Sequence, residues 1–165
     1  NAPQTMGKKE KQRQPNVDIW LPPTFRTSEE KWPLIVFSHD FGGCGNQSKF
    51  LTSYLADHGY IVIAPDHEDS DCRKSAAAYK GGLQDLRAGK NGRPERPLRN
   101  PDHWTAETES DRKDDVLFAV SSMLDDRMYK NYVDMDRVGL IGYGLGGYTA
   151  LGLAGGRQGW QGQSA

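Results

Sequence analysis

The sequence predicts an α/β fold in which helices cover both faces of a mostly parallel sheet. Three apolar runs have the length of buried strands: residues 33–38, 60–65 and 137–141. Between the first two runs, residues 47–58 carry apolar side chains at helical spacing and end before Gly59. Because strands that alternate with helices in this way pair in parallel, we expect one layered α/β domain.

Three further segments complete the expected elements. Residues 17–21 alternate between apolar and polar side chains, which is typical of a half-exposed strand at the start of a sheet. Residues 108–126 form a long helix, with Ser110 as the expected N-cap and acidic residues in the first turn. Residues 81–101 are rich in Gly and Pro, so we expect an inserted loop there.

The strand runs also predict an order within the sheet. We expect the strand at 34–38 to lie between those at 61–64 and 137–141, because right-handed crossovers place consecutive parallel strands side by side. The strand at 17–21 should then run antiparallel beside 61–64. The sheet would end at the strand 137–141, which would leave that edge apolar and open to association.

The ends of the chain differ in composition from its centre. We expect a polar, basic tail over residues 1–15, a partial domain over 16–154 and a flexible tail over 155–165. No apolar run reaches the length of a membrane span, so we expect a soluble protein, either cytoplasmic or secreted.

The charge balance limits the classes of partner. The 165 residues carry 21 basic and 22 acidic side chains, and this balance argues against a nucleic-acid-binding protein. Residues 73–99 hold eight Lys or Arg and two acidic residues. This basic segment is either a solvated loop or a cap that attracts anionic groups.

A glycine-rich turn follows the apolar run at 137–141. Residues 142–147 read Gly-Tyr-Gly-Leu-Gly-Gly and precede a helix of small residues at 148–154. In a G-x-S-x-G nucleophile elbow, a strained turn between strand and helix raises a serine above the sheet, and glycines flank it because side chains would collide with backbone. Gly144 occupies the place of that serine, so we expect no covalent catalysis at this position.

A second turn decides between an elbow and a nucleotide-binding glycine loop. Residues 38–43 read Ser-His-Asp-Phe-Gly-Gly directly after an apolar strand, as an oxyanion loop does, whereas a dinucleotide fold has no such segment. The backbone N–H groups of Phe41 and Leu145 are the expected oxyanion donors. The expected substrate-binding residues are His39, Asp40, Gly42 and Tyr143, of which His39 either braces its own loop or acts as a base.

The chain resembles α/β-hydrolases of the dienelactone-hydrolase-like group, which includes platelet-activating-factor acetylhydrolases and polyester hydrolases. The resemblance spans Val17 to Ala154 and rests on residues 33–39, residues 55–67 and the elbow with its second glycine, Gly147. It implies the N-terminal part of an α/β-hydrolase fold, with the C-terminal strands absent. It also implies a small-molecule ester or acyl substrate and no cofactor.

The chain departs from the pattern of that group at two places. The group has His-Gly in the oxyanion loop where this chain has His39-Asp40, and His-Ser in the elbow where it has Tyr143-Gly144. The acid and the histidine of this fold follow the nucleophile along the chain, yet no Asp, Glu or His follows Gly144. We therefore expect a truncated domain that requires a complementing C-terminal chain or a homo-oligomer.

Two functions from different classes remain. The first is a carboxylic-ester hydrolase of the esterase or lipase type that is inactive as written, because Gly144 carries no nucleophile. The second is a non-catalytic binding or scaffold domain that keeps the ester pocket for recognition or for pairing with another chain.

Two groups of residues leave structural alternatives open. Cys44 and Cys72 follow strands that we expect to be neighbours, so they are either two free thiols or a disulfide. A run of acidic and histidine residues resembles metal-ligand spacing, but an acidic turn after a strand is its commoner meaning, so we expect no metal. This run comprises Asp66, His67, Glu68, Asp69 and Asp71.

Overall fold

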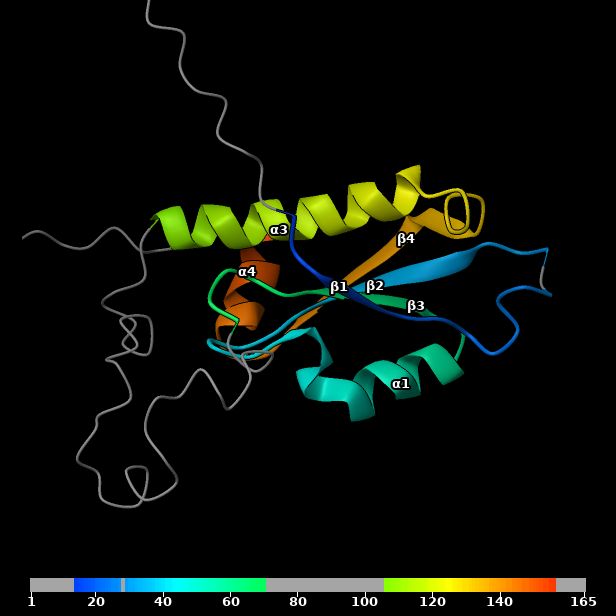
Figure 1. Cartoon of the computed structure of the whole chain (residues 1–165), viewed down its shortest axis with the longest axis horizontal. Helices are drawn as coiled ribbons and strands as arrows, with labels where there is room; N and C mark the ends of the chain where they lie inside the picture. The colour runs from blue at the N-terminus through cyan, green and yellow to red at the C-terminus, as the bar shows by residue number, and fades with distance from the viewer. Residues whose placement is uncertain (1–13, 28, 71–105, 157–165) are drawn as a thin grey trace, which may run out of the picture.

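A four-stranded sheet organises the chain in the computed structural model, which describes residues 14–27, 29–70 and 106–156 (Figure 1). The strands are β1 (Val17–Trp20), β2 (Trp32–Ser38), β3 (Ile61–Pro65) and β4 (Val133–Gly142). They lie in the order β1-β3-β2-β4, with β1 antiparallel to β3 and the other pairs parallel. This arrangement confirms the strand order expected from the sequence.

The fourth strand is longer than the apolar run that predicted it. The residues of β4 before Arg137 pair with the start of β2, and the register then shifts between Pro33 and Leu34. A proline cannot donate a backbone hydrogen bond to a neighbouring strand, which accounts for an irregularity at this place. The sequence prediction began at Arg137 because Asp134 and Asp136 interrupt the apolar pattern.

Helices cover both faces of this sheet, as Figure 1 shows. A short 3-10 turn (Gly45–Ser48) leads into α1 (Lys49–Asp57) on one face, and α3 (Ala106–Asp125) and α4 (Leu145–Leu153) contact each other on the opposite face. The long helix begins at Ala106, so the expectation of an N-cap at Ser110 was wrong: this residue lies inside the helix.

Alternating side chains divide the core into two layers. Along β3, Ile61 and Ile63 pack with Val116, Ala119 and other residues beneath α3. Side chains of the opposite parity, Val62 and Ala64 of β3 with Phe37 of β2, pack against α1 through Ala56. Because β2 and β3 are buried on both faces, they appear in the sequence as continuous apolar runs without alternation.

Several sequence predictions fall wholly or partly outside the described residues. They are the terminal tails, the inserted loop at 81–101, the basic segment and Cys72. Cys44 is disulfide-bonded, so the alternative of two free thiols was wrong. Among the helices that the structure describes, none is both long and apolar enough to cross a membrane.

Candidate functional site

The turn between β4 and α4 has the backbone geometry of a nucleophile elbow. Gly144 has φ 56° and ψ −123°, a conformation that residues with side chains rarely adopt. A Cβ atom at Gly142 would overlap the backbone oxygen of Gly146, and a Cβ atom at Gly146 would overlap the backbone oxygen of Ser38. Close backbone approach therefore requires the two flanking glycines, and Gly144 lies between them with its surface exposed.

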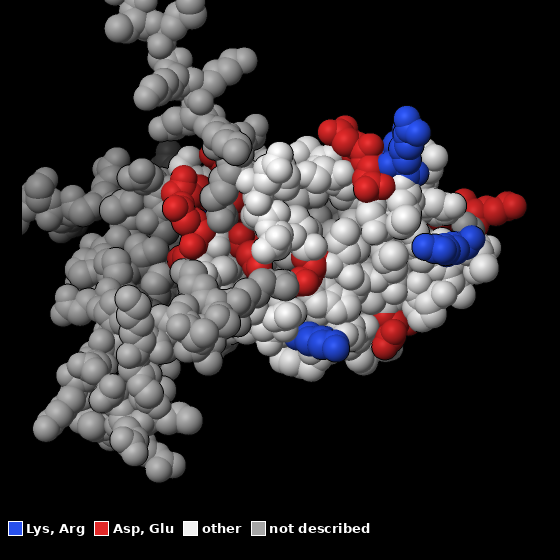
Figure 2. Space-filling model, viewed as in Figure 1, with Lys and Arg blue, Asp and Glu red and all other residues white. Residues whose placement is uncertain are grey.

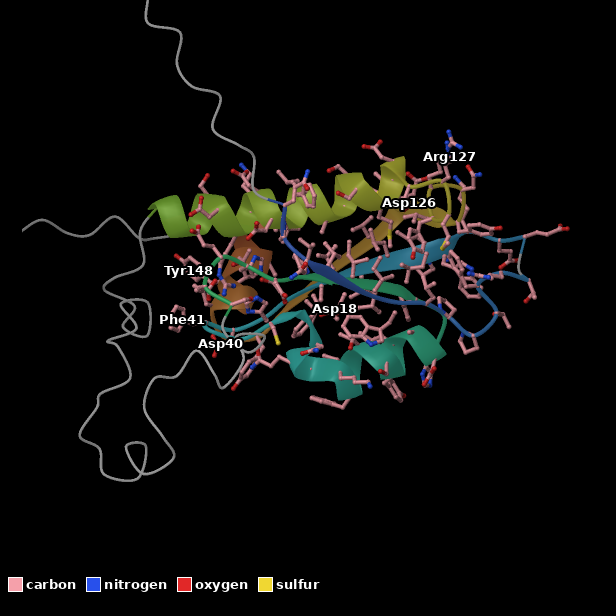
Figure 3. The ribbon with its side chains drawn as sticks, in the orientation of Figure 1. Asp18, Asp40, Phe41, Asp126, Arg127 and Tyr148 are labelled. Carbon is pink, nitrogen blue, oxygen red and sulfur yellow. The ribbon has the colours of Figure 1, made fainter. Side chains whose placement is uncertain are left out.

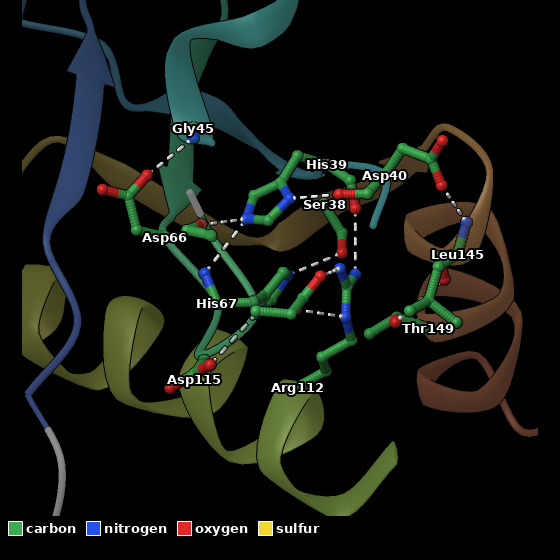
Figure 4. A network of polar contacts seen from close by, with 12 residues as sticks. Ser38, His39, Asp40, Gly45, Asp66, His67, Arg112, Asp115, Leu145 and Thr149 are labelled. Carbon is green, nitrogen blue, oxygen red and sulfur yellow. Dashed lines mark hydrogen bonds and ion pairs between the residues drawn. The ribbon is translucent and has the colours of Figure 1, made fainter. Parts of the chain in front are cut away.

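The side chain of Asp40 fills the space in which a serine at position 144 would stand. A Cβ atom at Gly144 would overlap Oδ1 of Asp40. The same oxygen accepts a hydrogen bond of 2.9 Å from the N–H of Leu145, as the close-up in Figure 4 shows. One of the two expected oxyanion donors is thus already bound to a carboxylate of this chain.

The second expected donor belongs to the same loop. Phe41 follows Asp40 directly, and Figure 3 places both at the end of the sheet where Tyr148 of α4 lies. The N–H of Phe41 donates no hydrogen bond to another described residue. The expected substrate-binding residue Gly42 donates its N–H to Oδ2 of Asp69 at 3.0 Å, while Tyr143 is 62% exposed.

His39 is fully buried beneath this loop. Its Nδ1 lies 2.6 Å from the backbone oxygen of Asp40, and its Nε2 accepts the backbone N–H of His67 at 3.0 Å. A carbonyl oxygen only accepts, so Nδ1 carries the proton. Burial lowers the pKa of His39 below its usual 6.5, and the positive charge of Arg112 acts in the same direction, so the ring is neutral. His39 therefore braces the loop, one of its two expected roles, and exposes no surface to a substrate.

A buried ion pair lies under the same loop and was not foreseen from the sequence. Arg112 of α3 binds both carboxylate oxygens of Asp69, at 3.1 and 2.8 Å, and donates to the backbone oxygen of His39 at 2.9 Å. Burial by itself raises the pKa of Asp69, but the charge and hydrogen bonds of Arg112, together with the N–H of Gly42, hold it below 3.8. Arg112 thereby ties the loops after β2 and β3 to α3.

A second buried network has the atom sequence of a Ser-His-Asp triad. Oγ of Ser38 lies 2.8 Å from Nε2 of His67, and Nδ1 of His67 lies 3.2 Å from Oδ2 of Asp115 (Figure 4). The carboxylate accepts from Nδ1, so Nε2 is the acceptor for the serine hydroxyl. The exposed fractions are 3% for Ser38, 1% for His67 and 3% for Asp115, so this network joins the ends of β2 and β3 to α3 without reaching the surface.

One signal in the sequence could have revealed the charged residues of α3. Arg112 stands four residues before Val116, and Asp115 stands four residues before Ala119, so all four share the helix face that packs on the sheet. A charged residue within an apolar stripe is buried only with a partner. The pairing itself depends on Asp69 and His67, which no local pattern connects to this helix.

Three residues of the acidic run after β3 take part in buried contacts, whereas Asp71 lies outside the described residues. Oδ1 of Asp66 accepts the N–H of Gly45 at 2.8 Å, while His67 and Asp69 bind the residues described above. Within the ranges that the structure describes, no three His, Cys, Asp or Glu residues are grouped as metal ligands.

Comparison with known proteins identifies the family. The model of the dienelactone hydrolase family matches residues 24–162. The chain belongs to this family. The resemblance inferred from the sequence is thus confirmed. The mixed sheet with helices on both faces is part of an α/β-hydrolase fold, as the sequence predicted.

Individual proteins match the chain at 25% to 30% sequence identity. The chain is 30% identical over 140 residues to platelet-activating factor acetylhydrolase of Bos taurus and 28% identical over 142 residues to that of Cavia porcellus. Both alignments cover 74% of this chain, which spans 32% and 31% of the two relatives. The ferulic acid esterase of Streptomyces cinnamoneus superimposes with a TM-score of 0.51 at 25% identity, over 77% of this chain and 34% of that protein. The chain thus spans about a third of the relatives that it matches.

The viewed face of the described residues carries no continuous basic surface. Figure 2 shows its Lys and Arg side chains as separate patches, whereas several acidic side chains gather beside the grey atoms, at the end where α3 begins. This distribution accords with the balanced charge of the sequence, although the basic segment at 73–99 lies outside the described residues.

Proposed function

We propose that this chain is the N-terminal part of a carboxylic-ester hydrolase domain that forms no acyl-enzyme as written. The observation that carries the proposal is the elbow: Gly144 has the strained backbone of the nucleophile position but no side chain, and the carboxylate of Asp40 faces it. Ester hydrolysis by this fold needs an oxygen nucleophile at the elbow, a histidine that takes its proton and an acid that orients the histidine. Gly144 removes the first of these groups.

Two features support the ester class of substrate. The family match and the names of the similar proteins, an acetylhydrolase and an esterase, both denote cleavage of acyl bonds. The backbone angles of Gly144 and the contact between Leu145 and the loop after β2 also support it. A small-molecule ester is therefore the substrate class for a completed domain. We propose that a complementing C-terminal chain or a second copy contributes the acid and the histidine of the completed domain.

The alternative function is a non-catalytic binding or scaffold domain that needs a partner chain. One observation favours it specifically, since Oδ1 of Asp40 takes the N–H of Leu145 that an acyl oxygen would need. In a serine hydrolase such backbone donors stabilise the tetrahedral intermediate. A chain in which this donor is already bound has lost a part of the catalytic machinery besides the nucleophile.

Covalent labelling tests the proposal. The chain is incubated with a fluorophosphonate probe and, separately, with p-nitrophenyl acetate, and the products are analysed by mass spectrometry. We expect neither a covalent adduct nor burst kinetics, because both require an activated nucleophile. Inhibitor-sensitive turnover of the ester by the unmodified chain would contradict the proposal, and the labelled peptide would show whether Ser38 or another residue is the nucleophile.

A further inference from the structure

Asp40 and Gly144 lie on distant segments of the chain but share one small volume. A Cβ atom at Gly144 would overlap both Cγ and Oδ1 of Asp40 and would lie 2.8 Å from Oδ2. The whole carboxylate therefore faces the position of the missing side chain. Two groups cannot share this volume, so a side chain at 144 requires the carboxylate of Asp40 to turn away.

Several contacts hold Asp40 where it is. Its backbone oxygen accepts hydrogen bonds from Nδ1 of His39 at 2.6 Å and from the N–H of Gly43 at 2.9 Å. Its side chain accepts the N–H of Leu145 at 2.9 Å, at the first residue of α4. The helix dipole favours a negative charge at this end. The loop and the helix thus hold both ends of the residue.

We propose that Asp40 is an internal occupant of the acyl-oxygen site, and that its presence depends on the absence of a side chain at position 144. The carboxylate takes the N–H of Leu145 that the carbonyl oxygen of an ester would otherwise accept. This inference rests on the proposed function, in which Leu145 is an oxyanion donor. Its consequence is that a side chain at 144 and the present position of the Asp40 carboxylate exclude each other: a serine at 144 displaces the carboxylate from the N–H of Leu145.

A double-mutant cycle tests this dependence through thermal stability. The variants are Gly144→Ser, Asp40→Gly and their combination. Gly155→Ser is a matched control, since Gly155 also has a positive φ, of 87°, but no atom lies within 4 Å of its added Cβ. We expect Gly155→Ser to lower Tm by about 5 °C from backbone strain alone, and Gly144→Ser by about 10 °C because it also overlaps Asp40.

The decisive comparison is the effect of Asp40→Gly in each background. It should raise the Tm of the Gly144→Ser protein, because it removes the overlap, and lower the Tm of the Gly155→Ser protein, because it only removes a hydrogen bond. If Asp40→Gly lowers Tm equally in both backgrounds, the two positions are independent and the inference is wrong.

Amide hydrogen exchange tests the occupied donor even where a serine variant does not fold. The first N–H groups of a helix have no acceptor within the helix, so the N–H of Leu145 depends on Asp40. We expect Asp40→Gly to speed exchange at Leu145 by about tenfold or more, and Asp40→Asn to change it little because its amide oxygen still accepts. The N–H of Gly146, bound to the backbone oxygen of Tyr143 at 2.9 Å, is the internal control. Equal exchange at Leu145 with and without Asp40, measured relative to Gly146, would overturn the inference.

These outcomes are separable from those of the proposed function. A fluorophosphonate adduct on the unmodified chain would refute the proposed function and leave the contact between Asp40 and Leu145 as it is. Additive Tm changes would refute the dependence between Asp40 and Gly144. They would not affect the proposal that position 144 provides no nucleophile.

Discussion

Two polar regions lie at the same end of the sheet, and they differ in what their side chains do. Around His67 and Arg112, buried charged and polar groups form hydrogen bonds with one another. These bonds connect the ends of β2 and β3 to α3. Around Gly144, the backbone has the geometry of a nucleophile elbow, position 144 carries no side chain, and the carboxylate of Asp40 faces it. The first region is therefore held together by paired side chains, whereas the second is defined by its backbone.

The difference has an energetic cause. Removing one member of the buried network leaves a charge or a polar group without its partner in a medium of low polarity, which is costly. Replacing a serine at the elbow by Gly144 leaves no such group behind, and glycine suits the positive φ of that turn better than any other residue. The buried network stabilises the fold through paired groups, whereas Gly144 leaves no polar group that needs a partner.

The largest expected effect concerns Arg112. Replacing it with Met leaves Asp69 buried without its cation, so we expect a loss of about 3–5 kcal/mol in the free energy of unfolding. Arg137→Met is the matched control, because Arg137 also binds a carboxylate, that of Asp134, and a backbone oxygen, that of Lys31, but is largely exposed. Urea denaturation should show almost no loss for the control. Equal losses for the two variants would show that the buried Arg112–Asp69 pair stabilises the fold no more than the exposed Arg137–Asp134 pair.

Acid should lower the stability of the folded chain in two pH ranges, one for His39 and one for Asp69. The pKa of His39 is lowered from 6.5 by burial, so the unfolded chain takes up this proton first, and the associated stability is present above pH 6.5 and is lost as the pH falls below it. The pKa of Asp69 is held below 3.8 despite the opposing effect of burial, so its contribution is present above pH 3.8 and is lost below that value. Tm measured against pH should fall in both ranges. His39→Gln should abolish the first step alone; a variant that keeps both steps would show that His39 is not the titrating group.

A smaller effect is expected from Ser38. Replacing it with Ala removes the hydrogen bond to Nε2 of His67, which should cost about 1–2 kcal/mol of unfolding free energy. The buried position of Ser38 predicts that the Ser38→Ala protein, like the unmodified chain, forms no adduct with fluorophosphonate. A labelling signal that disappears with Ser38→Ala would instead place a working triad in the network that we describe as structural.

The edge of β4 should affect association without affecting folding. On the described part of the sheet β4 pairs only with β2, and Met135 and Val138 on this strand are 45% and 41% exposed. We expect sedimentation velocity to show association of the isolated chain, and Val138→Lys to reduce it with little change in Tm. A well-folded monomer at tens of micromolar would contradict this expectation.

The sequence by itself determined the architecture and the position of the glycine-rich turn between β4 and α4. Continuous apolar runs identify β2 and β3, because strands buried on both faces need apolar side chains at every position. The glycines at 142 and 146 identify the elbow, because the steric limit that requires them is local. The absence of a side chain at position 144 is also read from the sequence directly, because Gly144 is one residue of that turn.

Only the tertiary structure decided how the side chains around that turn are used. The contact between Asp40 and Leu145 joins residues 105 positions apart, and that between Arg112 and His39 joins residues 73 apart. Sequence periodicity reports which face of an element is buried, but not which residue of another element meets it there. The hydrogen bond from Leu145 to Asp40 and the buried pairing of Asp69 are therefore properties of the folded chain, because each depends on where two loops and a helix come together.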